Sequence, residues 1–142
     1  MSCLFCGIAA GEVTASIVFE DQFSIAFLDH RPLFPGHCLV IPKAHFETLT
    51  DLPADLMGPF FKNVQMLAAA VQSAMQAQGS FVAINNRVSQ SVPHVHVHIA
   101  PRTKGDGLKG FFWPRSKYKN ETEIAAVQQL IQAAVREIKS RS

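Results

Sequence analysis

Three histidines at alternate positions are the residues of this chain best suited to chemistry. They are His94, His96 and His98, half of the six histidines in the sequence, and apolar β-branched residues stand between them. In a strand over 93–102, this spacing would place the imidazoles on one face and the apolar side chains on the other. Imidazole titrates near neutral pH and can act as a nucleophile, a proton carrier or a metal ligand. The pattern favours a chemical site, against solvated histidines or part of a metal site alone.

The elements that must position these histidines predict one α+β domain over residues 1–142. The composition, 48% hydrophobic and 17% charged, excludes a disordered chain. Apolar runs between turn signals predict five strands. The order of strands and helices indicates a mainly antiparallel five-stranded sheet with two helices packed on one face. The expected strands are 16–20, 23–29, 37–42 (the central one), 81–85 and 93–102.

Two segments have the apolar spacing of amphipathic helices. Apolar side chains recur every three or four residues over Leu56–Met75, and Gly79 is expected to close this helix. Asn120 with Glu123 resembles a capping box, which predicts a C-terminal helix with an apolar stripe over Ile124–Ile138.

Charge and cysteine usage narrow the class of protein. The net charge is +2, from 13 Lys and Arg against 11 Asp and Glu, so no nucleic-acid partner is expected. Neither a membrane span nor a signal peptide is recognisable, so we expect a cytoplasmic protein without a membrane partner. In the cytoplasm, Cys3 and Cys6 are expected to be a metal-binding pair or free thiols rather than a disulfide. Their Cys-x-x-Cys spacing suits two thiolates on one tetrahedral zinc, which needs two further ligands. Cys38, in an apolar run, is expected to be a small buried residue.

Several motifs in the right order resemble the histidine-triad (HIT) family. The family motif, His-x-His-x-His-x-x with apolar x, corresponds to His94–Ala100. Gln90–Val92 upstream, Asp29 after an apolar strand and the segment Gly36–His45 also fit the family pattern. The resemblance covers roughly residues 3–102.

The resemblance implies an enzyme, a nucleotidyl hydrolase or transferase acting on a nucleotide substrate. Cleavage would occur at the α-phosphate of an adenosine phosphate derivative, such as an adenylate phosphoramidate or a dinucleoside polyphosphate. His96 matches the histidine that attacks phosphorus and carries the nucleotidyl group. His98 would hydrogen-bond the phosphate or the bridging oxygen, and Gln90 and Ser91 would donate to the non-bridging oxygens. Asp29 would accept from the ribose hydroxyls.

Other features of the family leave alternatives open. Asn85 and Asn86 replace a longer glycine-rich turn of many members, so one of them contacts substrate or both are ordinary turn residues. The resemblance also implies a homodimer with a sheet continued across it. The loop with Phe111–Trp113 is expected to add specificity, or else to cover the core.

The resemblance also completes the metal site. Family members with the N-terminal cysteine pair add two histidines, which correspond to His45 and His94 beside Cys3 and Cys6. Four protein ligands leave no open position, so this zinc would be structural. Two other functions stay open: a metal-dependent hydrolase in which triad histidines bind a catalytic zinc, and a nucleotide-binding scaffold protein with residual activity.

Overall fold

The structure of the protein is a computed structural model that describes residues 2–108 and 115–141. The chain forms two compact units, Met1–Asp106 and Gly107–Ser142. The predicted loop with Phe111–Trp113 lies outside the described residues. None of the described helices is long and apolar enough to cross a membrane.

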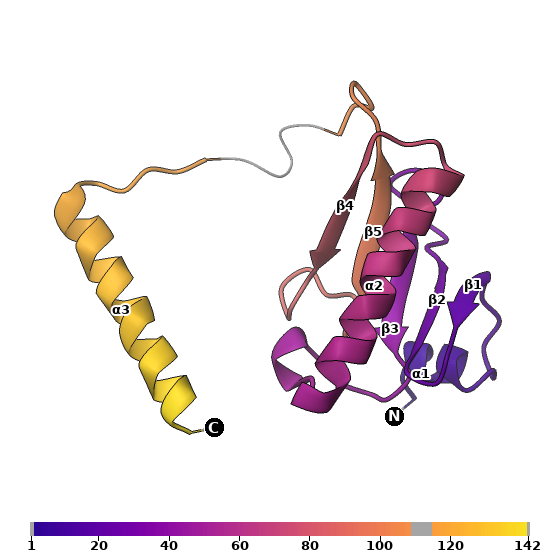
Figure 1. The fold of residues 1–142 in the computed structure, drawn as a ribbon, viewed down its shortest axis with the longest axis horizontal. Helices are drawn as coiled ribbons and strands as arrows, with labels where there is room; N and C mark the ends of the chain where they lie inside the picture. Colours follow the sequence, from indigo (N-terminus) through magenta and orange to yellow (C-terminus); the bar gives the residue numbers. More distant parts are fainter. Residues whose placement is uncertain (1, 109–114, 142) are drawn as a thin grey trace. The chain divides into compact units, whose positions relative to one another are not determined.

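The first unit is built on a five-stranded sheet with the strand order β1-β2-β3-β5-β4 (Figure 1). Every pair of neighbouring strands is antiparallel, and β3 lies in the middle. The predicted sheet and its central strand are thus confirmed. The strands are β1 (Ile17–Glu20), β2 (Ser24–Leu28), β3 (Cys38–Pro42), β4 (Gly79–Ile84) and β5 (Val97–Arg102).

The strand predicted over 93–102 is wrong in its first half, because β5 begins only at Val97. Upstream, the backbone N–H of Val95 donates to the Phe46 carbonyl at 2.7 Å, and that of His94 donates to Val92 at 2.8 Å. These two hydrogen bonds, one within the loop and one to the segment after β3, take the place of pairing with a neighbouring strand. Of the three histidines, only His98 lies on the sheet.

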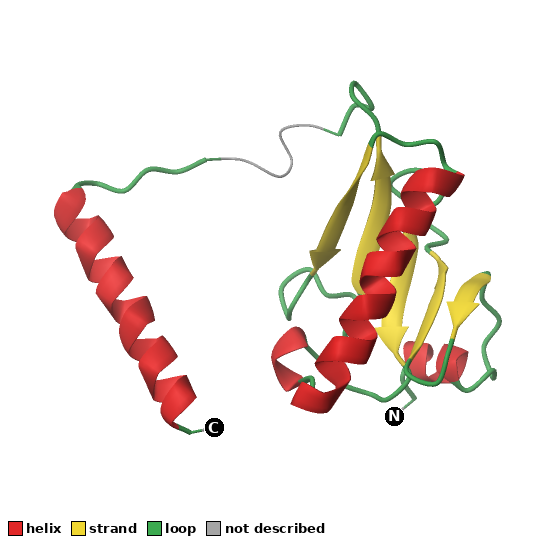
Figure 2. Ribbon diagram, viewed as in Figure 1, coloured by secondary structure: helices red, strands yellow, loops and turns green. Residues whose placement is uncertain are grey.

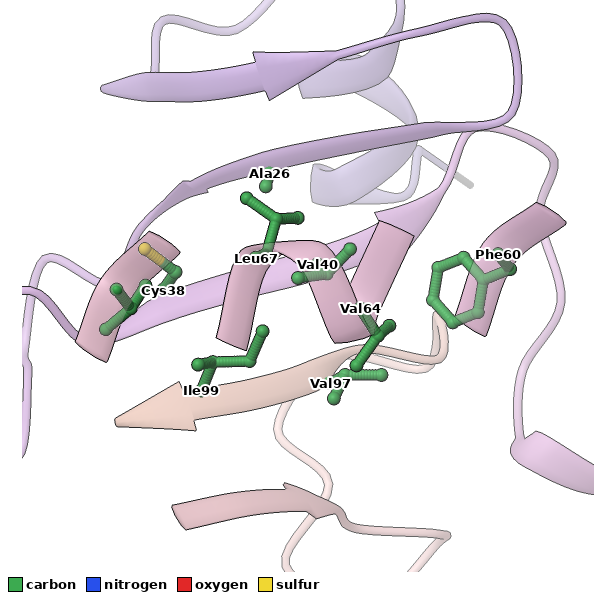
Figure 3. Packing of buried hydrophobic residues seen from close by; sticks show 9 residues of the cluster. Ala26, Cys38, Val40, Phe60, Val64, Leu67, Val97 and Ile99 are labelled. Carbon is green, nitrogen blue, oxygen red and sulfur yellow. The ribbon is translucent and has the colours of Figure 1, made fainter. Parts of the chain in front are cut away.

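The long helix α2 (Ala54–Ala74) covers one face of the sheet (Figures 1 and 2). Figure 3 shows Leu67 beside Ala26 and Val64 beside Val97. The predicted apolar stripe is therefore confirmed as the face that builds this core. Its buried members are Phe60, Val64, Leu67 and Val71, which pack with Ala26, Cys38, Val40, Val97 and Ile99.

A helix that the sequence did not predict, α1 (Leu4–Ala9), packs in a second core. Successive apolar residues of β2 and β3 belong alternately to the first and the second core. Both faces of these strands are apolar, so each face must be buried by a helix. The expectation of helices on one face only is therefore wrong. The second core contains Phe5, Ile8, Ile25, Phe27, Leu39 and Ile41.

The ends of the helices differ in how well the sequence marks them. Helix α2 stops at Ala74, and Gln76 makes the turn with a left-handed φ of 51°. Gly79 begins β4 instead of closing the helix. In the second unit, α3 (Glu121–Ser140) begins as predicted, because the Asn120 side chain accepts a hydrogen bond from the Glu123 N–H at 2.9 Å.

The turn before the histidines contains two non-glycine residues with left-handed φ, Arg87 (68°) and Ser89 (62°). We expect Ser89→Gly to raise the free energy of unfolding by up to about 1 kcal/mol, because glycine adopts this conformation without steric cost. Ser91→Gly is the control, since the φ of Ser91 is not left-handed; it should lower stability by about 0.5 kcal/mol. Urea unfolding of both variants measures the difference, and equal losses in the two would contradict the assigned strain.

Candidate active site and metal centre

Two cysteines and two histidines form a compact cluster at the start of the chain. The ligand atoms of Cys3, Cys6, His45 and His94 all lie within 4.8 Å of one another. Nδ1 of His94 lies 3.5 Å from the sulfur of each cysteine. Nδ1 of His45 lies 3.3 Å from the Cys6 sulfur and 3.2 Å from Nδ1 of His94. Cys3 caps α1 and Cys6 follows one helical turn later, so the helix brings both sulfurs to the same side.

These separations fit a tetrahedral metal centre. A zinc ion with Zn–S near 2.3 Å and Zn–N near 2.05 Å separates two nitrogens by about 3.3 Å, and a nitrogen from a sulfur by about 3.5 Å. The ring nitrogen Nε2 of His94 lies 2.8 Å from the carbonyl oxygen of Pro42. A carbonyl only accepts, so Nε2 carries the proton and the lone pair of Nδ1 faces the sulfurs. The structure thus brings the four residues together, with His94 in the tautomer that a metal at Nδ1 requires.

Burial shifts the pKa values of two groups in the cluster. Burial lowers the pKa of His94, which keeps the ring neutral and able to act as a ligand. Burial, together with the neighbouring Cys3, raises the pKa of the Cys6 thiol. Two adjacent thiolates therefore need a compensating positive charge.

The His96 side chain is hydrogen-bonded through Nδ1, whereas His94 is hydrogen-bonded through Nε2. Its Nδ1–H donates to the backbone carbonyl of His94 at 2.8 Å, which leaves the lone pair on Nε2. His96 is only 3% exposed. Among the described residues, no fully buried side-chain nitrogen or oxygen lacks a hydrogen-bond partner. Nε2 has no hydrogen bond to a described residue and is not among the fully buried atoms, so it keeps some contact with solvent.

His37, to which the sequence analysis gave no role, controls the ring of His98. The Leu33 N–H donates to Nδ1 of His37 at 3.0 Å, so the proton of the neutral ring sits on Nε2. Nε2 lies 3.0 Å from Nδ1 of His98 and donates to it. His98 therefore carries its proton on Nε2 and can offer an N–H to a ligand. Only the register of Leu39 opposite His98 brings these rings together, and sequence alone does not supply that register.

A second group of possible metal ligands, Asp29, His37 and His98, also lies within 4.8 Å. The same hydrogen bond from Leu33 makes this group a poor metal site. Metal binding at Nε2 of His37 would require Nδ1 to carry the proton, facing another N–H. The tautomers thus favour a metal at the cysteine cluster only.

Burial keeps both rings of this pair neutral. It lowers the pKa of His37, and it lowers that of His98 to about 4, with His96 and His37 adding to the shift. Near neutral pH, His98 is therefore a hydrogen-bond donor rather than an acid.

Two of the predicted polar residues hold the loop that leads to the histidines. The Gln90 amide donates to the Glu47 carbonyl at 2.6 Å and accepts from the Arg87 N–H at 2.8 Å. The Asn86 side-chain oxygen accepts from Leu49, the first residue of a short 3-10 helix, at 2.8 Å. In this structure both side chains bind backbone groups and so hold the loop in place.

The other predicted polar residues have side-chain groups that could bind a ligand. Ser91 is exposed and Asn85 half-buried, and neither side chain has a hydrogen bond to a described residue. Asp29 directly follows β2, and its Oδ1 accepts from the Arg31 N–H at 2.9 Å. The other carboxylate oxygen, Oδ2, lies 3.7 Å from Nε2 of His37.

Known proteins share these features. The HIT domain model matches residues 10–105. The chain is 42% identical to an uncharacterized HIT-like protein of Methanocaldococcus jannaschii, over 74% of this chain and 82% of the relative. It is 32% identical to a bis(5'-nucleosyl)-tetraphosphatase (asymmetrical) of Schizosaccharomyces pombe, over 81% of this chain and 64% of the relative.

A solved structure extends the comparison to the whole chain. The crystal structure of a Zn-bound histidine triad family protein from Mycobacterium smegmatis superposes with a TM-score of 0.71 at 34% identity, covering 100% of this chain and 99% of that one. Fold and site thus define an α+β protein with a histidine site beside a possible metal centre. The chain belongs to the HIT family, as its motifs indicated.

The depressed pKa of His98 predicts how stability changes with pH. Below the ordinary histidine value of 6.5 the unfolded chain takes up a proton that the folded protein accepts only near pH 4. The free energy of unfolding should therefore fall as pH is lowered from 7 to 4. His98→Asn does not titrate, so we expect a shallower fall in urea unfolding at matched metal content. Equal slopes for the variant and the parent protein would contradict this assignment.

Proposed function

We propose that the protein is a nucleotidyl hydrolase or transferase that cleaves at the α-phosphate of a nucleoside phosphate derivative. The observation that carries this proposal is the hydrogen bond from Nδ1–H of His96 to the His94 carbonyl. In the neutral ring this bond places the lone pair on Nε2, and a nucleophilic histidine needs such a free nitrogen.

The reaction has two displacements. Nε2 of His96 attacks the α-phosphorus, the bond from phosphorus to the leaving group breaks, and a nucleotidyl-imidazole forms. Water or another acceptor then attacks the same phosphorus and frees Nε2. The ring becomes positively charged in the intermediate, and the His94 carbonyl that accepts from Nδ1–H stabilises this charge.

Neighbouring groups have supporting roles in this proposal. His98 donates its Nε2–H to a phosphate or bridging oxygen, and the Ser91 hydroxyl donates to a non-bridging oxygen. Asp29 accepts from the ribose hydroxyls. Asn85 is the better candidate of the asparagine pair, because Asn86 already binds the backbone. Gln90 acts by positioning the loop, and donates to substrate only if its bond to Glu47 opens.

Two substrate classes suit this site, adenylate phosphoramidates and dinucleoside polyphosphates. The name of the fission-yeast relative, a bis(5'-nucleosyl)-tetraphosphatase, supports the second class. A homodimer, a cytoplasmic location and a single domain over 1–142 complete the proposal.

The covalent intermediate gives the direct test. The protein is mixed with a panel of adenylated substrates, with and without phosphate, and quenched early. We expect mass spectrometry to find adenosine monophosphate on His96, and His96→Ala to lower turnover by about 10³-fold or more. The control is His30→Ala, because His30 is exposed and makes no hydrogen bond or ring contact to the site among the described residues. Full turnover by His96→Ala would contradict the proposal. Undiminished nucleotide binding without turnover by the parent protein would instead indicate a scaffold.

We propose that the metal is zinc, held by Cys3, Cys6, His45 and His94 in a structural role. The tetrahedral donor set and the Zn-bound family structure support it. When bound, zinc would supply a fixed positive charge that holds both thiolates and ties α1 to the histidine segment.

Zinc content and stability test this assignment together. Purified protein should contain stoichiometric zinc, and Cys3→Ala should lose the metal and lower the melting temperature by about 5 °C or more. Cys38→Ala is the matched control, because Cys38 lies in the other core and should keep the metal. A metal-free parent protein with an unaltered melting temperature would contradict a structural role of zinc. Immediate loss of turnover in metal-free but folded protein would favour a catalytic zinc.

A further inference from the structure

The side chain between the two cysteines contacts the proposed nucleophile. Phe5 lies in α1 and is 5% exposed. Its ring centroid lies 5.1 Å from that of His96, and the two planes are nearly perpendicular, at 87°. The same ring lies 6.0 Å from His94 and 5.4 Å from Phe27. Phe5 therefore joins the metal-ligand segment, the second core and the nucleophile.

The hydrogen bond of His96 alone does not fix its ring plane. A single bond from Nδ1–H to the His94 carbonyl allows the ring to swing, since the χ2 torsion of histidine has a broad energy well. The His98 ring contacts His96 at 5.0 Å and 62°, and Phe5 contacts it at 5.1 Å. A flat ring in perpendicular contact limits this swing in a way that a flexible aliphatic chain does not.

The geometry points to Phe5 as a positioning residue that holds the His96 imidazole in the plane needed for attack. This inference rests on the proposed function for its catalytic consequence, but the hold on the ring exists without substrate. Since Cys3 and Cys6 bracket Phe5, the metal-ligand segment thereby sets the orientation of the nucleophile.

The effect belongs on the chemical step rather than on binding. Substrate contacts such as those of Asp29 and Ser91 do not involve Phe5, so KM should stay within about twofold. A misdirected Nε2 lone pair slows attack on phosphorus, so kcat for Phe5→Leu should fall about tenfold or more.

The matched control is Phe60→Leu. Phe60 is fully buried in the core under α2, on a different core from Phe5, and its ring contact is with Phe61. Both variants should lose similar stability, whereas only Phe5→Leu should lose kcat. Phe5→Met, which replaces the ring by a flexible apolar side chain, serves as the second variant if Phe5→Leu does not fold.

A spectroscopic readout separates this inference from the proposed function. In zinc-loaded protein labelled with ¹⁵N-histidine, NMR should show the Nδ1–H proton of His96 slowly exchanging with water. We expect the Phe5 variant, with unchanged zinc content, to lose or broaden this signal, and Phe60→Leu to keep it. An unchanged signal in the Phe5 variant, or a kcat no lower than that of Phe60→Leu, overturns the inference. If the parent protein cleaves no substrate in the panel, the proposed function fails and the NMR signal alone decides the role of Phe5.

Discussion

Two backbone carbonyls determine what the histidines of this protein can do. Pro42 accepts from Nε2 of His94, and His94 accepts from Nδ1 of His96. A neutral imidazole has one donor and one acceptor nitrogen, so each carbonyl decides which nitrogen keeps its lone pair. The lone pair of His94 faces the cysteines, and that of His96 faces the surface. His94 and His96 are thus held in the tautomers that the proposed metal centre and the proposed nucleophilic site each need.

This arrangement depends on the late start of β5. Inside a regular antiparallel strand, the His94 carbonyl would accept from a backbone N–H of the adjacent strand. Because the strand begins only at Val97, that carbonyl is outside the ladder and accepts from the ring two residues on. The residue spacing predicted that the histidines lie together, and the rings of His96 and His98 do lie 5.0 Å apart. Alternation along one strand is not what brings them together, because His94 and His96 precede β5. Pro93 has no N–H to donate to a ladder, so the sequence argues against regular pairing at residue 93, but it does not indicate that pairing begins only at Val97.

Features with a local signal were predictable, and features that depend on register were not. The apolar runs of β2 and β3 and the stripe of α2 follow from periodicity, and the Asn120 cap follows from one residue pair. Helix α1 has six residues, too few for a periodic signal. The pairing of His37 with His98 joins residues 61 positions apart, and it exists only because β3 and β5 are neighbours in one register.

The proposed metal centre and the proposed nucleophile are linked in two ways, through a side chain and through the backbone. Through the side chains, Phe5 links the cysteine segment to the His96 ring. Through the backbone, His94 supplies both a ligand nitrogen and the carbonyl that orients His96. A ligand held by a tetrahedral ion cannot rotate freely, so ligation also limits movement of its own carbonyl. If the proposed function and the proposed zinc hold, a structural metal would influence catalysis without touching substrate, because it would fix the His94 carbonyl and the Phe5 packing that orient the His96 ring.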